Sequence, residues 1–342
     1  MSKEKDNPVV AKRKEIVDKI ISMMEQGDFF HNRAEWNRSA FSPQNPFSNA
    51  VYKGGNRIRL MLAAYLNQYD DPRWATFKQI SDAGYKVKKG AHGISCEKWS
   101  FYKEQTVKDE HGKVVKDPSG NPMKEIVELE HPVCRSFTVF HASQIEGLPE
   151  MAMETAWEKT DLSTLADQLI AASECPVYER SQGRAYYSVT RDEIILPPRA
   201  VFKDEESFVK TMLHEEAHST GSPTRLNREI GNSFGDEKYA KEELVAELGA
   251  LFAESDLGIH LQAEHYEDHS DYLKSWIAAL KDDYSVFFAA VADAEKAADR
   301  IMGNYRRVHQ KELIESAEVS ACVGAAVHAN EQKKSETAKR TK

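Results

Sequence analysis

The chain has 342 residues, of which 41% are hydrophobic and 30% are charged, with 55 acidic side chains against 46 basic ones. This hydrophobic content is too high for a wholly disordered chain, and the length exceeds what one core usually organises, so we expect two domains. The formal charge of −9 argues at first against nucleic-acid binding, but an average can hide a basic domain beside an acidic one.

The cysteines and the apolar segments indicate the compartment. The chain contains 4 cysteines, far apart and without a CxxC pair, which predicts reduced thiols. The first residues carry lysines with no apolar segment behind them, and no stretch approaches the roughly 18 apolar residues of a membrane helix. The sequence therefore predicts a cytoplasmic protein with no membrane partner.

The charge is segregated along the chain. Residues 1–103 hold 18 Lys and Arg against 11 Asp and Glu, a net of +7, which leaves −16 for the remainder. Two stretches, 52–60 and 73–90, interleave cations with aromatic rings, as single-stranded nucleic acid requires. The alternative is an ordinary solvated basic face with core aromatics. The candidate DNA contacts are Tyr52, Lys53, Asn56, Arg57, Arg59, Arg73, Trp74, Lys78, Lys88 and Lys89.

The first domain is expected to end near residue 150. Residues 104–132 are polar and charged with a Pro-Ser-Gly-Asn-Pro turn, and they read as a hairpin excursion or a long loop. Residues 133–140 form a run of β-forming residues, and Gly-Leu-Pro-Glu at 147–150 then marks a break in regular secondary structure. We therefore predict an α+β DNA-binding domain over residues 1–150.

The remainder is predicted to be a mostly helical domain with a small sheet, over residues 151–320, so that the whole chain is α+β. A disordered tail without apolar periodicity is expected over residues 321–342. A run of β-formers at 185–198 predicts a hairpin or a long strand that ends at Pro197. Helical spacing is found at 157–172, 204–220, 236–255 and 270–302.

The helix at 204–220 carries the HExxH pattern, as His214-Glu215-Glu216-Ala217-His218. Two histidines four residues apart lie on one helix face, so both can reach one tetrahedral Zn²⁺, while the glutamate after the first can serve as general base for water. Asp204 is suited to the N-cap and Gly221 to the stop. We therefore predict His214 and His218 as zinc ligands and Glu215 as the catalytic acid/base.

A third ligand is expected from a later helix, which leaves the fourth position open. In the helix at 236–255, Glu243 and Glu247 lie four residues apart on a face that is otherwise small, as close packing requires. We assign Glu243 as the ligand and Glu247 as the carboxylate that orients an imidazole, and the reverse assignment stays open. The alternative to a metal site is a pair of surface histidines beside a solvated acidic helix.

Several short motifs lie in a fixed order along residues 10–305. In the first half they are Tyr52-x-Gly54-x-Asn56, Arg73-Trp74-x-Thr76-Phe77-Lys78-Gln79, Gly84-x-x-Val87-x-Lys89-Gly90 and Gln144-x-x-Gly147-Leu148-Pro149. In the second half they are Asp192-x-Ile194-x-Leu196-Pro197, His214-Glu215-x-x-His218-x-Thr220-Gly221, Arg225-Leu226-x-Arg228, Phe234-Gly235 and Glu242-Glu243-Leu244-Val245-Ala246-Glu247. With these motifs the chain resembles the ArdC-type antirestriction proteins, whose N-terminal domain is shared with TraC-type plasmid primases.

The resemblance implies a single-stranded DNA-binding domain joined to a zincin-like metallopeptidase domain. It implies a protein of plasmids, phages or other mobile elements that is associated with protecting incoming DNA from host restriction. It also implies His214, His218 and a glutamate within 242–247 as metal ligands, with Glu215 as the catalytic residue.

We therefore predict an antirestriction-type protein with an HExxH, gluzincin-like zinc metallopeptidase site, whose partners are single-stranded DNA and an unidentified protein or peptide substrate. One alternative is a DNA-binding or DNA-protecting protein with a structural or vestigial zinc site. Another is a plasmid primase accessory, although the sequence shows no separate primase motif. Glu215 argues against a structural site, because such a site has no use for a general base.

Overall fold

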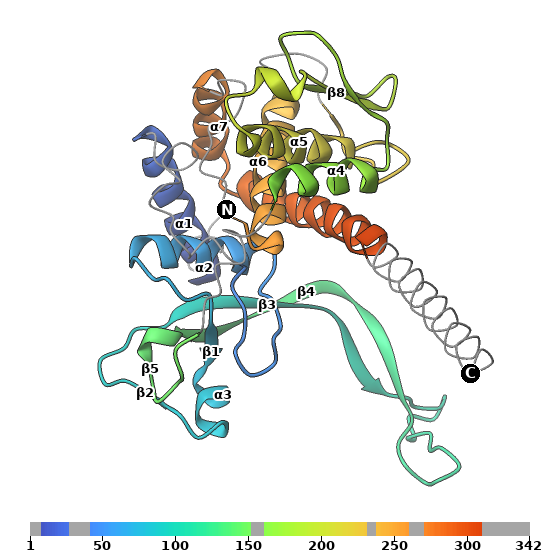
Figure 1. The fold of residues 1–342 in the computed structure, drawn as a ribbon. Helices are drawn as coiled ribbons and strands as arrows, with labels where there is room; N and C mark the ends of the chain where they lie inside the picture. The colour runs from blue at the N-terminus through green and yellow to red at the C-terminus, as the bar shows by residue number, and fades with distance from the viewer. Residues whose placement is uncertain (1–7, 27–41, 152–160, 231–236, 260–269, 310–342) are drawn as a thin grey trace, which may run out of the picture. The chain divides into compact units, whose positions relative to one another are not determined.

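The computed structural model describes residues 8–26, 42–151, 161–230, 237–259 and 270–309. The chain divides into two compact units, Met1–Ile16 with Glu35–Ala152 and Val17–Ala34 with Met153–Lys342. The predicted α+β class is confirmed (Figure 1). No helix within the described ranges is long and apolar enough to cross a membrane. The predicted disordered tail, 321–342, lies outside the described residues.

The first unit combines short helices with two antiparallel sheets. Helix α1 contributes only its first residues to this unit. The elements in chain order are α1 (Pro8–Glu25), α2 (Gly55–Leu66), β1 (Trp74–Thr76), α3 (Phe77–Asp82), β2 (Lys86–Val87), β3 (Ile94–Thr106), β4 (Lys124–His141), the 3-10 turn η2 (Ala142–Gln144) and β5 (Ile145–Glu146).

The larger sheet has the order β1-β4-β3, and β2 pairs with β5 in a second one. Helix α2 covers the larger sheet at its base, where Leu60 and Ala64 pack with Trp74, Cys96 and Val139. This cluster is the main core of the unit, because all five side chains are at most 3% exposed. Burial of such apolar side chains stabilises the fold by roughly 1.5–3 kcal/mol each for the larger ones.

Beyond this core, β3 and β4 continue as a two-stranded ribbon that leaves the sheet (Figure 1). The ribbon settles the two interpretations of residues 104–132 in favour of the hairpin. Its tip closes through two tight turns, in which Gly112 and Gly120 donate to the carbonyls of Asp109 and Asp117 and adopt positive φ angles of 79° and 83°. The strand predicted at 133–140 is the last part of β4, which begins earlier, at Lys124.

The second unit places helices around a three-stranded sheet. The sheet order is β6-β8-β7, with β6 parallel and β7 antiparallel to β8, so the β7–β8 pair is the hairpin that the sequence left open. The elements in chain order are α4 (Leu162–Ala172), β6 (Val177–Glu179), β7 (Tyr186–Ser188), β8 (Glu193–Leu196), the 3-10 turn η4 (Arg199–Val201), α5 (Glu205–Ser219), α6 (Glu237–Leu257), α7 (Ser270–Asp282) and a further helix over 285–309.

Helices α5 and α6 approach each other closely. A Cβ atom added to Gly249 of α6 would lie 3.2 Å from the Cβ atom of Ala217 on α5 and 3.5 Å from that of Ala297. A larger residue at this position would require Ala217 to shift by a few tenths of an ångström, so the absence of a side chain at Gly249 allows the close approach of the two helices. The indole of Trp276 on α7 donates to the carbonyl of Ala240 at 2.7 Å and fixes α6 from another side.

One predicted element is wrong in its extent. The helix expected at 270–302 is two helices, because Asp283 interrupts it and caps the second one: its carboxylate accepts from the backbone N–H of Ser285 at 2.8 Å. The second helix then continues to residue 309 within the described range. The helix expected at 157–172 is α4, and its predicted first residues lie outside the described ranges.

Candidate metal centre

Helix α5 is specified by its own residues. The carboxylate of Asp204 accepts from the backbone N–H of Ser207 at 2.8 Å, and Glu205 and Glu206 place negative charge in the first turn. The helix ends at Ser219, directly before Thr220 and Gly221, as predicted. Because the helix is regular between these ends, His214 and His218 lie one turn apart on one face.

Three side chains converge between α5 and α6. The Nε2 atoms of His214 and His218 are 3.1 Å apart. The carboxylate of Glu243 faces both: one oxygen is 3.6 Å from Nε2 of His214 and the other is 3.6 Å from Nε2 of His218. All three side chains are buried, and their ligand atoms lie within 4.8 Å of one another. The structure thus brings together the three residues that the sequence assigned as ligands.

The other ring nitrogen of each histidine faces a further carboxylate. Nδ1 of His214 is 3.3 Å from Glu247, and Nδ1 of His218 is 3.3 Å from Glu242. Arg228 holds Glu242 in place, through contacts of 2.6 Å and 2.9 Å. The sequence interpretation included Glu247 in this role but missed Glu242 and Arg228. The signal for them was present, since Glu242 precedes Glu243 and Arg228 stands in the Arg225-Leu226-x-Arg228 motif.

The electrostatics of the centre favour positive charge. Burial alone would lower the pKa of the histidines, but the facing carboxylates outweigh it, so the pKa of His214 lies well above its ordinary value and that of His218 is raised to about 9. Burial would raise the pKa of Glu243, but the two histidines lower it well below its usual range. The pocket of carboxylates therefore stabilises cations at its centre.

This donor set fits a divalent metal ion. When both histidines carry their proton on Nδ1, directed at Glu247 and Glu242, both Nε2 lone pairs point at each other across 3.1 Å, an arrangement that a cation between them stabilises. Two tetrahedral ligands with metal bonds of about 2.0–2.1 Å lie about 3.3–3.4 Å apart. The measured separations of 3.1 and 3.6 Å lie on either side of that value.

The two central glutamates of the motif have different surroundings. Glu215 is only 5% exposed, and its charge is one of those that raise the pKa of His214. Glu216 accepts a hydrogen bond of 2.8 Å from Ser173, and burial raises its pKa to about 7. Glu215 is therefore the glutamate whose charge acts on the proposed metal ligands, while Glu216 is tied to the segment after α4.

Beyond the helix, Arg225 ties the end of α5 to the β7–β8 hairpin. Its guanidinium bonds Asp192 and the hydroxyl of Tyr187, and it donates to the carbonyl of Ser219 at 2.7 Å. The Asp192 and Arg225 motifs of the sequence thus fix the position of the helix end relative to the sheet.

The predicted DNA contacts fall into two groups. Some of them are internal: Arg57, Arg59 and Trp74 are at most 6% exposed, and as they lie they are not available to a bound strand. The amide of Asn56 bonds both the N–H and the carbonyl of Glu97, at the open edge of β3. These side chains hold the first unit together.

The remaining candidates lie nearer the surface. Tyr52 and Arg73 are half-buried, with the Tyr52 hydroxyl donating to the carbonyl of Trp74 and Arg73 paired with Asp71. Four lysines are exposed, and two of them have local partners, Asp82 at 2.7 Å and the carbonyl of Ser143 at 2.8 Å. The exposed lysines are Lys53, Lys78, Lys88 and Lys89.

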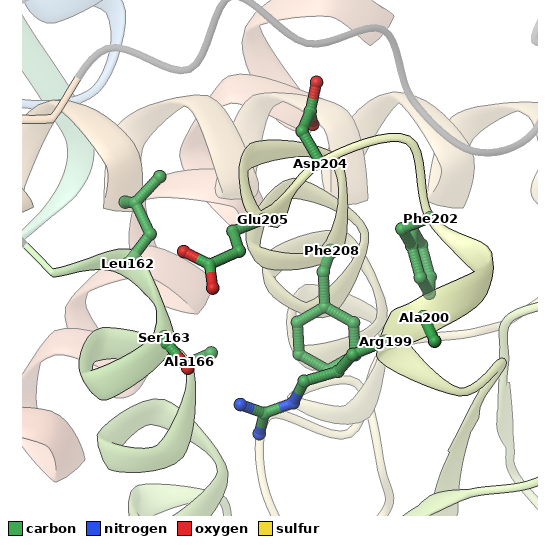
Figure 2. A pocket seen from close by; sticks show the side chains of 9 residues that line it. All are labelled: Leu162, Ser163, Ala166, Arg199, Ala200, Phe202, Asp204, Glu205 and Phe208. Atoms are coloured by element: carbon green, nitrogen blue, oxygen red, sulfur yellow. The ribbon is translucent and has the colours of Figure 1, made fainter.

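A separate cavity of about 270 Å³ lies in the second unit between α4, η4 and the start of α5 (Figure 2). Arg199 lies over the ring of Phe208 at 4.8 Å and pairs with Asp167 and Glu179. The cavity contains none of the three converging side chains. Its lining residues are Leu162, Ser163, Ala166, Arg199, Ala200, Phe202, Asp204, Glu205 and Phe208.

Two protein families match the chain in sequence. Residues 11–140 match the N-terminal domain of anti-restriction factor ArdC. Residues 164–293 match a family of zincin-like metallopeptidases, and this range contains all the residues of the converging centre. The two matches follow each other along the chain in the order that the motifs indicated.

Solved structures and a longer protein are also similar. The metal-free crystal structure of the antirestriction protein ArdC from plasmid R388 superposes with a TM-score of 0.65 at 32% identity, over 86% of this chain and 98% of that one. Its Mn(II)-bound structure gives 0.65 at 30% identity, over 86% and 97%. The DNA primase TraC of Escherichia coli is 36% identical over 312 residues, which are 89% of this chain but only 28% of the primase.

Proposed function

The chain belongs to the ArdC-type antirestriction proteins, and on this basis we propose that it binds single-stranded DNA and hydrolyses a peptide bond at a zinc site, as the product of a mobile element. The observation that carries the peptidase part is the convergence of His214, His218 and Glu243 within a zincin-like domain. Glu215, in the position of a general base, distinguishes this site from a purely structural one.

Zinc is the metal that we propose. Two imidazoles and one carboxylate suit a borderline ion with four ligands and one open position, whereas Mn²⁺ prefers more oxygen donors. The manganese-bound form of the R388 protein supports a site for a divalent ion, and such a site can exchange zinc for manganese. We propose Glu243 rather than Glu247 as the third ligand, because Glu243 faces both Nε2 atoms while Glu247 faces Nδ1 of His214.

The chemistry follows from the positions of the side chains. A divalent ion supplies a Lewis acid for the attacked carbonyl. Glu215 accepts a proton from the attacking water and later returns it to the leaving amine. Glu247 and Glu242 hold the two imidazoles in the tautomer that presents Nε2 to the centre. Burial of all these groups keeps bulk water from competing for their hydrogen bonds.

A polypeptide is the substrate class that the sheet favours. Strand β7 is an edge of the sheet in the second unit, and it packs beside α5. An extended peptide could add to such an edge through main-chain hydrogen bonds, which would present its carbonyl groups in a regular row.

Single-stranded DNA binding is proposed for the first unit. Its support is the excess of 21 Lys and Arg over 17 Asp and Glu in this unit and the set of exposed lysines, which can neutralise phosphates without sequence preference. The similarity to TraC favours one alternative, a role as a primase accessory. A primer-synthesis assay with a primase added to a single-stranded template separates the two, because an accessory would raise the yield of primer whereas the proposed function requires only binding.

The peptidase proposal is tested by a matched pair of variants in cells. New protein N-termini are compared by mass spectrometry among cells that express wild type, Glu215→Gln or Glu216→Gln. We expect cleavage products with wild type and with Glu216→Gln, which keeps the centre, and none with Glu215→Gln.

Persistence of the same products with Glu215→Gln would show that another protein makes them. Absence of products from all three strains, with the metal still bound, would favour the structural or vestigial site instead.

A further inference from the structure

One face of the β3–β4 ribbon has a pattern that the metal centre and the fold leave unexplained. Cross-strand neighbours form rungs along the two strands: Cys96 with Phe137, Lys98 with Arg135 and Ser100 with Val133 alternate onto one face, and beyond a shift in register Tyr102 pairs with Glu128. We call these four rungs the Lys98 face. Phe137 packs against the core of the first unit, so the face begins at the sheet and runs outward along the ribbon.

The second rung pairs two cations. Lys98 and Arg135 are directly opposite each other and both are exposed. Like charges in this position destabilise a strand pair. Within the described part of the chain, neither side chain has an ion-pair partner. This rung thus carries two positive charges without an ion-pair partner among the described residues, and the two backbones are one strand spacing apart.

Other cations of the ribbon do not face a second cation. Lys124, near the tip, pairs with Glu104 at 2.6 Å. Lys103 lies opposite Val127 in the register of the two strands. Two cations directly opposite each other are therefore a local property of the Lys98 rung. A general excess of lysine on the ribbon does not account for them.

Aromatic and apolar groups flank the double charge. Phe137 lies one rung inward and Val133 one rung outward, each about 7 Å from the double charge, and Tyr102 lies further along the ribbon, beyond the shift in register. Val133 is 43% exposed and Tyr102 is 59% exposed, although both are groups that a fold usually covers. Glu128, opposite Tyr102, is the carboxylate of these rungs, so the Lys98 rung is where an anion fits.

We propose that the Lys98 face is a track for single-stranded DNA, with a phosphate between Lys98 and Arg135 and bases against Val133 and Tyr102. An anion between the two cations removes the repulsion of the rung, and an exposed ring offers a stacking surface to any base. This inference rests on the proposed DNA binding and specifies where the strand lies. It assigns a surface that the sequence stretches 52–60 and 73–90 do not contain.

The test compares two double variants with the same change in charge. Binding of a labelled oligothymidylate to the full-length protein is measured by fluorescence anisotropy over a range of salt concentrations. Lys98→Ser with Arg135→Ser removes the proposed phosphate contact, while Lys103→Ser with Lys124→Ser removes two charges from elsewhere on the ribbon. Tyr102→Ser removes the stacking ring, and circular dichroism shows that each variant is folded.

The first pair is expected to weaken binding about 10-fold at low salt and to reduce the slope of log affinity against log salt by about 0.7 to 1.4, the contribution of one or two phosphates. Tyr102→Ser is expected to weaken binding about 10-fold with the slope unchanged, because stacking releases no counterions. The control pair is expected to stay within about 2-fold of wild type.

Equal losses in the two double variants would overturn the track, because net charge alone would then explain them. Competition by polyglutamate as effective as that by DNA would also overturn it and assign the face to acidic protein segments. Absence of any binding by the wild type at low salt would refute the proposed DNA binding itself, and so is distinguishable from failure of the track.

Discussion

At the centre, Glu242, Glu243 and Glu247 are chemically identical side chains whose positions on α6 give them different roles. Glu243 and Glu247 are one turn apart, so periodicity places them on one face, and the sequence assigned Glu243 as the ligand with the reverse assignment left open. The close crossing of α5 and α6 at Gly249 makes the difference, because it sets Glu243 level with both Nε2 atoms and Glu247 level with Nδ1 of His214. Glu242 lies further round the helix, where its carboxylate is 3.3 Å from Nδ1 of His218 and pairs with Arg228.

Replacing Glu247 by glutamine tests the assignment of the ligands. The amide keeps the size of the side chain but loses the charge that favours a proton on Nδ1 of His214. We expect the metal affinity to fall about 10- to 100-fold, as for other carboxylates that orient a ligating histidine. Titration with a chromophoric chelator measures this, with Glu216→Gln as the control and Glu243→Gln as the reference for loss of a ligand.

Two results would count against this assignment. An unchanged affinity in Glu247→Gln would mean that the carboxylate does not act on the imidazole. A loss as large as that of Glu243→Gln would favour the reverse assignment, with Glu247 as the ligand.

Among the elements, those specified by neighbouring residues were predictable and those specified by distant ones were not. Helix α5 has its cap, its acidic first turn and its stop within its own sequence, and its bounds agree with the prediction. The outer halves of β3 and β4 are polar and depend on each other across the ladder, so their extent was missed. The break at Asp283 was missed because aspartate is tolerated within helices, and its capping bond to Ser285 is a detail of geometry.

Three elements of the first unit meet at Glu97. Its carboxylate bonds Arg13 of α1 at 2.6 Å, Arg59 of α2 at 2.7 Å and the indole of Trp99 on β3 at 3.0 Å. Burial would raise the pKa of Glu97, but these partners outweigh it and lower the pKa to about 2. The side-chain amide of Asn56 hydrogen-bonds the backbone N–H and carbonyl of the same residue, Glu97. Arg59 of α2 therefore holds this strand, whereas Arg57 bonds the hydroxyl of Ser42.

The lowered pKa of Glu97 predicts a pH dependence. A carboxyl group with a depressed folded-state pKa contributes stability above its unfolded value of about 4.5, and this contribution is lost as the pH falls toward 2. Glu97→Gln should therefore lower the free energy of unfolding of the first unit by roughly 2 kcal/mol at pH 7, by roughly half as much near pH 3, and by little at pH 2 and below. Hydrogen exchange of peptides from α2 and β3 measures the difference.

The control for this experiment is Glu104→Gln, which breaks the exposed pair with Lys124 and should change stability by less than about 0.5 kcal/mol at any pH. A constant difference between Glu97→Gln and wild type from pH 7 to pH 3 would show that the charge of Glu97 is not the cause.

For the whole molecule, the division of charge has a structural counterpart in both units. In the second unit, acidic side chains are drawn inside, where Glu242, Glu243 and Glu247 surround the histidines and are at most 5% exposed. In the first, part of the basic charge is also internal, as with Arg57 and Arg59, which composition alone could not show. The sequence therefore predicted which half carries which chemistry better than it predicted which basic residues are available.

The proposed peptidase activity depends on the metal centre, and the metal content of the purified protein tests this centre most directly. Zinc and manganese are determined by mass spectrometry in wild type, His214→Ala and Glu216→Gln, with circular dichroism as the check on folding. We predict about one divalent ion per chain in wild type and in Glu216→Gln, and almost none in folded His214→Ala. A full complement of metal in folded His214→Ala would contradict the proposed centre.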